Sequence, residues 1–230
     1  MSAGGGASPA SAGAAAHAFV DDLSDPVLSA DDRHHLSRVL RLRDGELVTV
    51  ADGRGAWRVT TFGASLAPAG EVQHERRHEV PSGVAFALVK GDRNELVVQK
   101  LTELGMDLIV PMHTERCVVR WDDDRSGRHV ERLRRVAREA AMQCRRAWLP
   151  DVREPAAFSK VATWPGAALA DAGGGPVTVR HQIVLVGPEG GWSATERASG
   201  LPVLGLATHV LRAETAAIAA AVLLNVARAS

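Results

Sequence analysis

A run of four apolar residues, Ile183–Val186, leads directly into the segment Gly187-Pro188-Glu189-Gly190-Gly191. A short apolar run that ends in turn residues is typical of a strand buried on both faces of a parallel sheet. Ligands of such sheets bind beyond the carboxyl ends of the strands, where a glycine-rich loop exposes its backbone to them. The loop matches neither GxxxxGK[ST] nor GxGxxG, which excludes a P-loop and the usual dinucleotide turn. A purely structural alternative is a tight turn before a helix that is capped by Ser193 and Glu196.

A second polar stretch, "LRAETAA", follows another apolar segment some twenty residues later. It places Arg212, Glu214 and Thr215 at the start of an otherwise apolar helix. Either Glu214 or Thr215 could cap the first amides of this helix, and Arg212 could pair with Glu189 or Glu214. An arginine at the end of a strand also indicates a polar pocket at the carboxyl edge of the sheet.

Strands and helices alternate from residue 84 onward. We expect strands in 84–90, 106–112, 182–187 and 205–212, and helices over 92–105 and 128–148. Asp92 and Glu95 match a capping box, and Gly105 matches a helix end. This pattern predicts an α/β fold with a parallel sheet that carries helices on both faces.

The N-terminal part is predicted to form a small β-barrel with one helix over residues 17–75. Two Asp-Gly dipeptides flank the alternating run 46–50, which is a strong hairpin signal. Residues 1–16 are expected to form a disordered tail, and residues 76–83 a linker. The remaining residues, 84–230, would form the second domain.

Composition excludes several classes of protein. The formal net charge is zero, so no field of the whole molecule attracts nucleic acid. Cys117 and Cys144 form no CxxC pair, and no His/Cys cluster has zinc spacing, so we expect no metal and a reduced, cytoplasmic protein. The apolar C-terminal stretch is shorter than the ~20 residues of a membrane span, and the N-terminus lacks the pattern of a signal peptide.

Arginines that could bind RNA gather in two places, because arginine forms planar contacts with phosphates. Residues 125–146 contain eight arginines and two glutamates. A solvated helix face and a GC-rich genome are the alternative explanations. The candidate RNA-binding residues are Arg33, Arg38, Arg41, Arg43, Arg128, Arg132, Arg135, Gln143 and Arg146.

The two C-terminal motifs, "VGPEGGWSATE" and "HVLRAETA", resemble those of the bacterial 16S ribosomal RNA uridine-N3 methyltransferases of the SPOUT class. Four further segments resemble this family in the same order, so the resemblance covers about residues 17–230. These segments are "HHLSRVLRLRDGELVTVADGRG", "KGDRNELVVQKLTELGMDLIVP", "TERCVVRW" and "REAAMQCRRAWLPDV". Ala207 and His209 depart from the family pattern.

The resemblance implies a SPOUT-like α/β domain with a deep trefoil knot, a PUA-like RNA-binding barrel and a homodimer with active sites near the interface. It also implies S-adenosylmethionine as methyl donor and 16S ribosomal RNA of the small subunit as substrate. The donor would be held by Val186, Gly187, Pro188, Glu189, Gly190, Gly191, Leu206, Val210, Leu211, Arg212, Glu214 and Thr215.

Methylation of uracil N3 requires removal of its proton and stabilisation of the resulting negative charge. The sequence leaves three candidate bases open, which are Glu115, Glu189 and Glu214. The candidate cations are Arg116, Arg146 and Arg212. Among all these we predict Glu115 and the three arginines as catalytic. A non-catalytic RNA-binding protein and a methyltransferase of another RNA base are the alternative functions.

Overall fold

The computed structural model describes residues 8–121 and 123–229, and it divides into two compact units. The first unit contains the chain up to residue 78 together with residues 138–149, and the second contains residues 79–137 and everything from residue 150 onward. The sequence placed residues 138–149 in the second domain. They pack in the first because Ala141 and Ala147 join the buried cluster of Phe19, Ala51 and Trp57.

The first unit is built on a five-stranded sheet. Strand β1 runs parallel to β2, β2 runs antiparallel to β3, and β3 pairs with both β4 and β5. The Asp52-Gly53 turn joins β2 to β3, as the Asp-Gly signal predicts. The elements are η1 (Pro9–Ala12), β1 (Ala16–Phe19), α1 (Ala30–His34), η2 (His35–Val39), β2 (Leu47–Ala51), β3 (Ala56–Thr61), β4 (Ala67–Pro68) and β5 (Gln73–His74).

The prediction of a disordered tail over residues 1–16 extends too far, because residues 9–12 form a regular element. Residues 1–7 lie outside the described residues, but Pro9–Ala12 forms the 3-10 helix η1. Pro9 starts this turn with a fixed φ and is buried, and Gly13 ends it in the left-handed conformation at φ 66°. The strand β1 then begins at Ala16.

The second unit contains a seven-stranded sheet in the order β12-β10-β11-β6-β7-β8, with β9 also paired to β7. Every pairing is parallel, which confirms the predicted fold class. The strands are β6 (Gly83–Ala87), β7 (Leu108–His113), β8 (Asp151–Val152), β9 (Ala156–Ala157), β10 (Ala167–Gly175), β11 (Ile183–Val186) and β12 (Val203–Leu204).

The last predicted strand was misplaced. Residues 205–212 contain no strand, and the chain pairs with the sheet only at Val203–Leu204. Strand β10 was not predicted from the sequence, although it is the longest strand of the sheet. Its alanines and glycines carry little of the β-branched signal that marks a strand.

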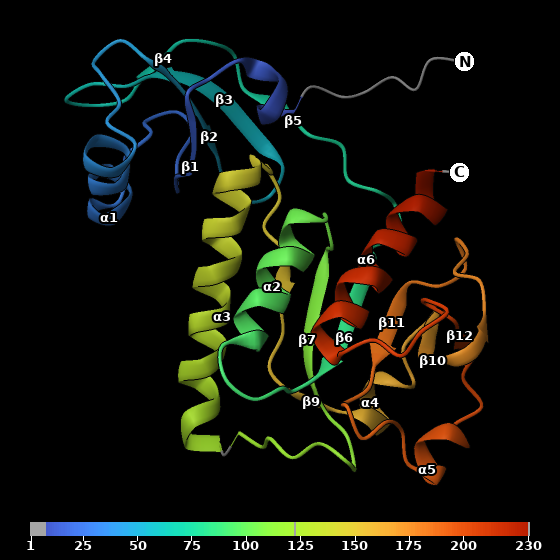
Figure 1. The fold of residues 1–230 in the computed structure, drawn as a ribbon. Coiled ribbons are helices and arrows are strands. Elements are labelled where there is room, and N and C mark those ends of the chain that lie inside the picture. The colour runs from blue at the N-terminus through green and yellow to red at the C-terminus, as the bar shows by residue number, and fades with distance from the viewer. Residues whose placement is uncertain (1–7, 122, 230) are drawn as a thin grey trace. The chain divides into compact units, whose positions relative to one another are not determined.

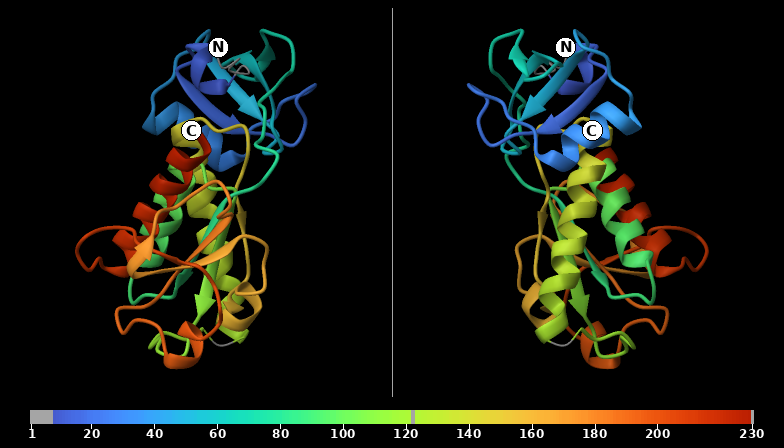
Figure 2. Two further views of the ribbon diagram at one scale, coloured as in Figure 1. Left: turned by 90° about the vertical axis from the view of Figure 1, so that its right-hand side faces the viewer. Right: turned by 90° about the vertical axis from the view of Figure 1, so that its left-hand side faces the viewer.

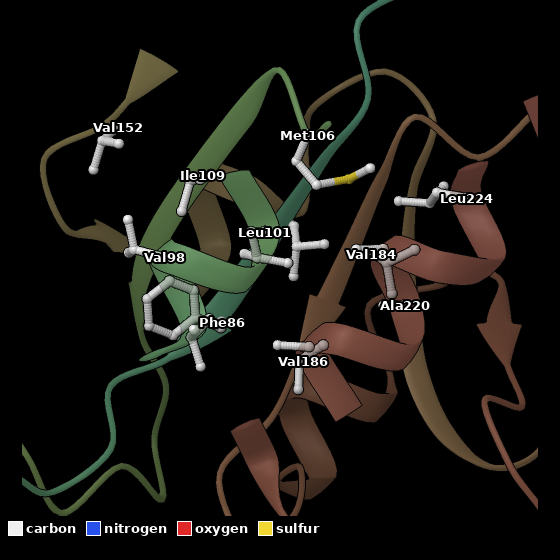
Figure 3. Packing of buried hydrophobic residues seen from close by; sticks show 14 of the residues in the cluster. Phe86, Val98, Leu101, Met106, Ile109, Val152, Val184, Val186, Ala220 and Leu224 are labelled. Carbon is white, nitrogen blue, oxygen red and sulfur yellow. The ribbon is translucent and has the colours of Figure 1, made fainter. Parts of the chain in front are cut away.

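Helices cover both faces of this sheet (Figures 1 and 2). On one face, α2 and α6 lie side by side and bury Val98, Leu101, Ala220 and Leu224 against the strands (Figure 3). On the other face, α4 packs with Trp192 in a second cluster. The helices are α2 (Arg93–Glu103), α3 (Asp123–Cys144), α4 (Phe158–Val161), α5 (Ala194–Arg197) and α6 (Ala213–Ala229).

Two details of the helices differ from the sequence prediction. Helix α3 ends at Cys144 rather than at residue 148, because Arg145 adopts a left-handed conformation at φ 59°. The Asp92 side chain does not cap α2, and the Glu95 carboxylate instead pairs with Arg132 at 2.8 Å. The predicted capping box of Ser193 and Glu196 is confirmed at the start of α5.

The backbones of β10 and β12 come into contact at two glycines. A Cβ atom on Gly174 would lie 2.4 Å from the carbonyl carbon of Leu204, and one on Gly205 would lie 2.7 Å from the Gly174 oxygen. Only glycine permits this approach. The trefoil knot stays a prediction, because strand order does not define how the chain is threaded.

One buried histidine makes the stability of the first unit depend on pH. His17 lies 2.8 Å from the Thr49 hydroxyl through Nδ1 and 3.0 Å from the Arg146 carbonyl oxygen through Nε2. Burial is the main cause that lowers the pKa of His17 from 6.5 to about 4. The folded protein therefore keeps this ring neutral at pH values where the unfolded chain protonates it.

We expect the free energy of unfolding to fall as pH drops from about 6.5 to about 4, with His17 contributing roughly 3 kcal/mol. Urea denaturation at several pH values, run beside the His17→Gln variant, measures this contribution. In the variant, the free energy of unfolding should depend less on pH between about 6.5 and about 4. Identical pH profiles for the two proteins would contradict the assignment.

Candidate ligand-binding site

The second unit has a cavity of about 240 Å³ at the carboxyl edge of its sheet. Its wall is formed by the middle of β10, the end of β11, the segments that follow β11 and β12, and the start of α6. The lining residues are 170–173 of β10, 186–189 with 191 and 192 around the glycine-rich loop, 206–211 after β12, and Ala213 and Ala216 of α6. Segments far apart in the sequence therefore meet at one site.

Eight of the twelve predicted donor-binding residues lie in this wall: Val186, Gly187, Pro188, Glu189, Gly191, Leu206, Val210 and Leu211. The other four, Gly190, Arg212, Glu214 and Thr215, are chain neighbours of wall residues but are not part of the wall. Residues 170–173 of the wall were not predicted from the sequence. The available signal was the short apolar run at 167–170, which ends in Asp171 and three nearby glycines.

The three glycines of the loop have different roles. Gly191 adopts a left-handed conformation at φ 66°, and its amide closes a turn onto the Pro188 carbonyl at 2.8 Å. A Cβ atom on Gly187 would lie 3.1 Å from the buried Trp192 ring. At Gly190 a Cβ atom would make only ordinary contacts with Arg116. A tighter approach of backbones than at this loop occurs between Gly174 of β10 and the segment Leu204–Gly205.

Arg93, the first residue of α2, joins the two polar motifs. Its Nη1 donates a hydrogen bond to Glu189 Oε1 at 3.2 Å and lies 3.7 Å from Glu214 Oε2. That Glu214 oxygen is buried and accepts no hydrogen bond from the described residues. Arg93 therefore takes the place that the sequence analysis considered for Arg212.

Two further arginines hold the loop. Arg116 Nη1 donates to the Gly190 carbonyl oxygen at 3.0 Å. Arg197 Nε donates to the Trp192 carbonyl oxygen at 3.4 Å, and Nη1 of the same side chain pairs with Asp171. Guanidinium groups of three different segments thus contact the loop or the residue that follows it.

The predicted catalytic residues do not all lie in one unit. Glu115 and Arg116 follow β7 and Arg212 precedes α6, all in the second unit, whereas Arg146 belongs to the first. Arg212 and Glu115 are exposed, and neither side chain has a hydrogen bond or ion pair within the described residues. The Glu115 amide donates to Glu196 Oε1 at 2.9 Å, which fixes the backbone at this position.

Most predicted RNA-binding side chains are on the surface. Arg33 is half-buried and donates to the Gly63 carbonyl oxygen at 3.0 Å, and Arg132 pairs with Glu95. Arg146 is half-buried, and its carbonyl oxygen faces the His17 ring. The remaining side chains are exposed: Arg38, Arg41, Arg43, Arg128, Arg135 and Gln143.

Within residues 8–121 and 123–229, no cluster of three or more His, Cys, Asp or Glu side chains is arranged to hold a metal ion. None of the helices in this part of the chain combines the length and the apolar character needed to cross a bilayer.

Comparisons with known proteins match both units. Residues 76–225 match the model of the RNA methyltransferase domain family, and residues 28–62 match that of the RNA methyltransferase PUA domain. Ribosomal RNA small subunit methyltransferase E of Mycobacterium bovis is 32% identical over 238 residues, which covers 88% of each chain. The protein of the same name from Synechocystis is 33% identical and covers 86% of this chain and 72% of its own.

A solved structure is also similar to this chain. It is the putative methyltransferase of Legionella pneumophila in complex with the cofactor S-adenosylmethionine. The two chains are 27% identical with a TM-score of 0.77, and the match covers 92% of this chain and 97% of the other.

The left-handed conformation of Gly191 generates a prediction about stability. Gly191→Val should lower the free energy of unfolding by about 1–3 kcal/mol, because a β-branched residue is strained at positive φ. Gly190→Ala is the matched control, since a Cβ atom there lies no closer than 3.6 Å to its neighbours. Chemical denaturation of both variants measures the difference. Equal stability of the two would mean that the loop does not depend on the conformation of Gly191.

Proposed function

Because the chain belongs to the RNA methyltransferase family, we propose that it transfers a methyl group from S-adenosylmethionine to N3 of a uridine in 16S ribosomal RNA of the small subunit. The observation that carries the proposal is the meeting of the two C-terminal motifs in one cavity at the carboxyl edge of the sheet. The names of the relatives support the RNA substrate, and the Legionella complex supports the donor.

The residues of the cavity fit this donor. Leu206, Val210 and Leu211 offer an apolar surface for the adenine ring, and the loop from Gly187 to Gly191 offers backbone groups with few side chains in the way. Two carboxylates, Asp171 and Glu189, are available for its polar groups. S-adenosylmethionine supplies an electrophilic methyl group that replaces the N3 proton.

Glu115 is the proton acceptor that this geometry favours. The other two candidates, Glu189 and Glu214, share the guanidinium group of Arg93. Glu115 has no such partner among the described side chains, and its neighbour Arg116 contacts the glycine-rich loop. A positioned base contributes about 10²–10⁴-fold to a rate.

We propose Arg212 as the cation that stabilises the developing negative charge on the uracil. Its chain neighbours Leu211 and Ala213 line the cavity, while its own side chain is exposed and unpaired within the described residues. Arg116 adds positive charge at the loop. The catalytic role of Arg146 stays a prediction.

The arginines of the first unit and of α3 are proposed to bind the RNA. The PUA match supports this role for the first unit. Because the net charge of the chain is zero, such local patches must provide the electrostatic attraction. Ribosomal RNA as substrate also implies a cytoplasmic location.

A homodimer is supported by an apolar hollow beside the donor cavity. This hollow has a volume of about 880 Å³ and shares residues 173 and 206–208 with the cavity wall. Val179 and Val226 in its lining are 65% and 58% exposed, and Val210 of the donor cavity is 96% exposed. A second copy that covers this surface would place each active site near the interface.

The decisive experiment incubates the protein with labelled S-adenosylmethionine and either naked 16S ribosomal RNA or small subunits, both taken from cells that lack this activity. Mass spectrometry of RNA fragments should find one N3-methyluridine. A methyl group on another base would replace the proposed target. An intact protein that binds no S-adenosylmethionine in calorimetry would instead favour a non-catalytic RNA-binding protein.

Arg212 allows a sharper test of the active site. Arg212→Lys keeps the charge but loses the planar guanidinium group, so we expect the single-turnover rate to fall at least about tenfold. Donor affinity and melting temperature should barely change. Arg180→Lys, an exposed arginine outside the cavity wall, is the control. A normal rate in folded Arg212→Lys protein would remove Arg212 from catalysis.

A further inference from the structure

The charged side chains in the wall of the donor cavity are both acidic. Among the residues of its wall are two carboxylates, Asp171 and Glu189, but neither lysine nor arginine. Each carboxylate is paired with an arginine that stands outside the wall, Asp171 with Arg197 and Glu189 with Arg93. The negative groups therefore border the cavity, and their positive partners do not.

Asp171 is held in a fixed orientation at the end of the apolar part of β10. Its Oδ1 accepts a hydrogen bond from the Ala172 amide at 2.9 Å, and its Oδ2 pairs with Arg197. Beside it, Trp192 Nε1 donates to the Ala170 carbonyl oxygen at 2.9 Å. The Asp171 side chain is only 20% exposed, so its carboxylate is a built feature of the wall and not a mobile surface group.

The carboxylates near the cavity outnumber the arginines that pair with them. Glu214 adds a third carboxylate, whose buried Oε2 lies 3.7 Å from Arg93. These three carboxylates share the guanidinium groups of Arg93 and Arg197, while Arg116 and Arg212 stand near the wall without a carboxylate partner within the described residues.

The Asp171 side chain is 20% exposed and that of its partner Arg197 is 53% exposed, so water screens the charge of Arg197 more than that of Asp171. In the other pair, Arg93 and Glu189 are 43% and 56% exposed, so both are open to water.

We propose that Asp171 and Glu189 make this cavity selective for the cationic methyl donor over its product, and that Arg93 and Arg197 position the two carboxylates. The proposal rests on S-adenosylmethionine as the donor. Its sulfonium carries a positive charge. When the methyl group leaves, sulfur keeps the bonding electron pair and becomes a neutral thioether in S-adenosylhomocysteine. A negative wall attracts the first form and loses that attraction for the second.

This selectivity has a direct consequence for turnover. Donor and product otherwise share the same adenosine and amino-acid groups, so a cavity that recognised only those groups would retain the product. A charge that favours the donor allows it to replace the product at similar concentrations. Asp171 is therefore assigned as a specificity-determining residue.

The experiment measures the affinities of S-adenosylmethionine and S-adenosylhomocysteine by calorimetry on the full chain. Asp171→Asn and Glu189→Gln should each weaken donor binding about tenfold and product binding less than about threefold. Asp151→Asn is the matched control, because Asp151 is also paired with an arginine, Arg153, but lies outside the cavity. It should leave both affinities unchanged.

The positioning role is tested by a double-mutant cycle. Arg197→Met should reproduce the selective loss of donor affinity, Arg197→Lys should restore part of it, and Arg197→Met should have little further effect on Asp171→Asn. A structural role alone would lower the melting temperature without changing the ratio of the two affinities. If Asp171→Asn does not fold, Glu189→Gln at its exposed position carries the test.

Two results would overturn the proposal, namely an unchanged donor affinity in both carboxylate variants, or an equal loss of donor and product affinity. The second would mean that the carboxylates hold groups common to both molecules. Failure of the unmodified protein to bind S-adenosylmethionine would be a different result, because it would remove the proposed function itself.

Discussion

The conformation of the loop from Gly187 to Gly191 is the constraint on which the site depends. Gly191 turns the chain with a left-handed φ. Arg93 of α2 and Arg116 after β7 contact the loop, and Arg197 of α5 contacts the next residue, Trp192. The contacts of these arginines join the loop and the residue after it to three segments, two of which are distant in the sequence.

The glycines of β10 and β12 serve the same site from the other side. Their backbone contact at Gly174 and Gly205 turns the chain after Leu204 toward the cavity, so that residues 206–211 line it. In β10, the strand that makes this contact, Asp171 reaches the wall three residues earlier. Strand β10 therefore provides both the glycine of the close backbone contact, Gly174, and a carboxylate of the cavity wall, Asp171.

Local sequence signals predicted the elements that depend on neighbouring residues, namely turns, helix caps and buried strands. The Asp52-Gly53 hairpin, the Ser193 and Glu196 capping box and the parallel sheet all followed from turn chemistry and hydrophobic pattern. Strand β10 was missed because alanine and glycine carry no strand signal. The pairing of Arg93 with Glu189 spans 96 residues, and a charged residue at a helix start gives no indication of such a distant partner.

The paired and unpaired charges of the second unit indicate a division of roles. Carboxylates that border the donor cavity are all engaged by arginines, which fixes their position but prevents them from moving toward a second substrate. Glu115 and Arg212 are the predicted catalytic side chains that keep their full hydrogen-bonding capacity within the described residues. A methyltransferase of uracil N3 needs paired side chains that hold the donor in place and unpaired side chains that act on the uracil while its N3 loses a proton. Under the proposed function, these two requirements would be met by different residues of this unit.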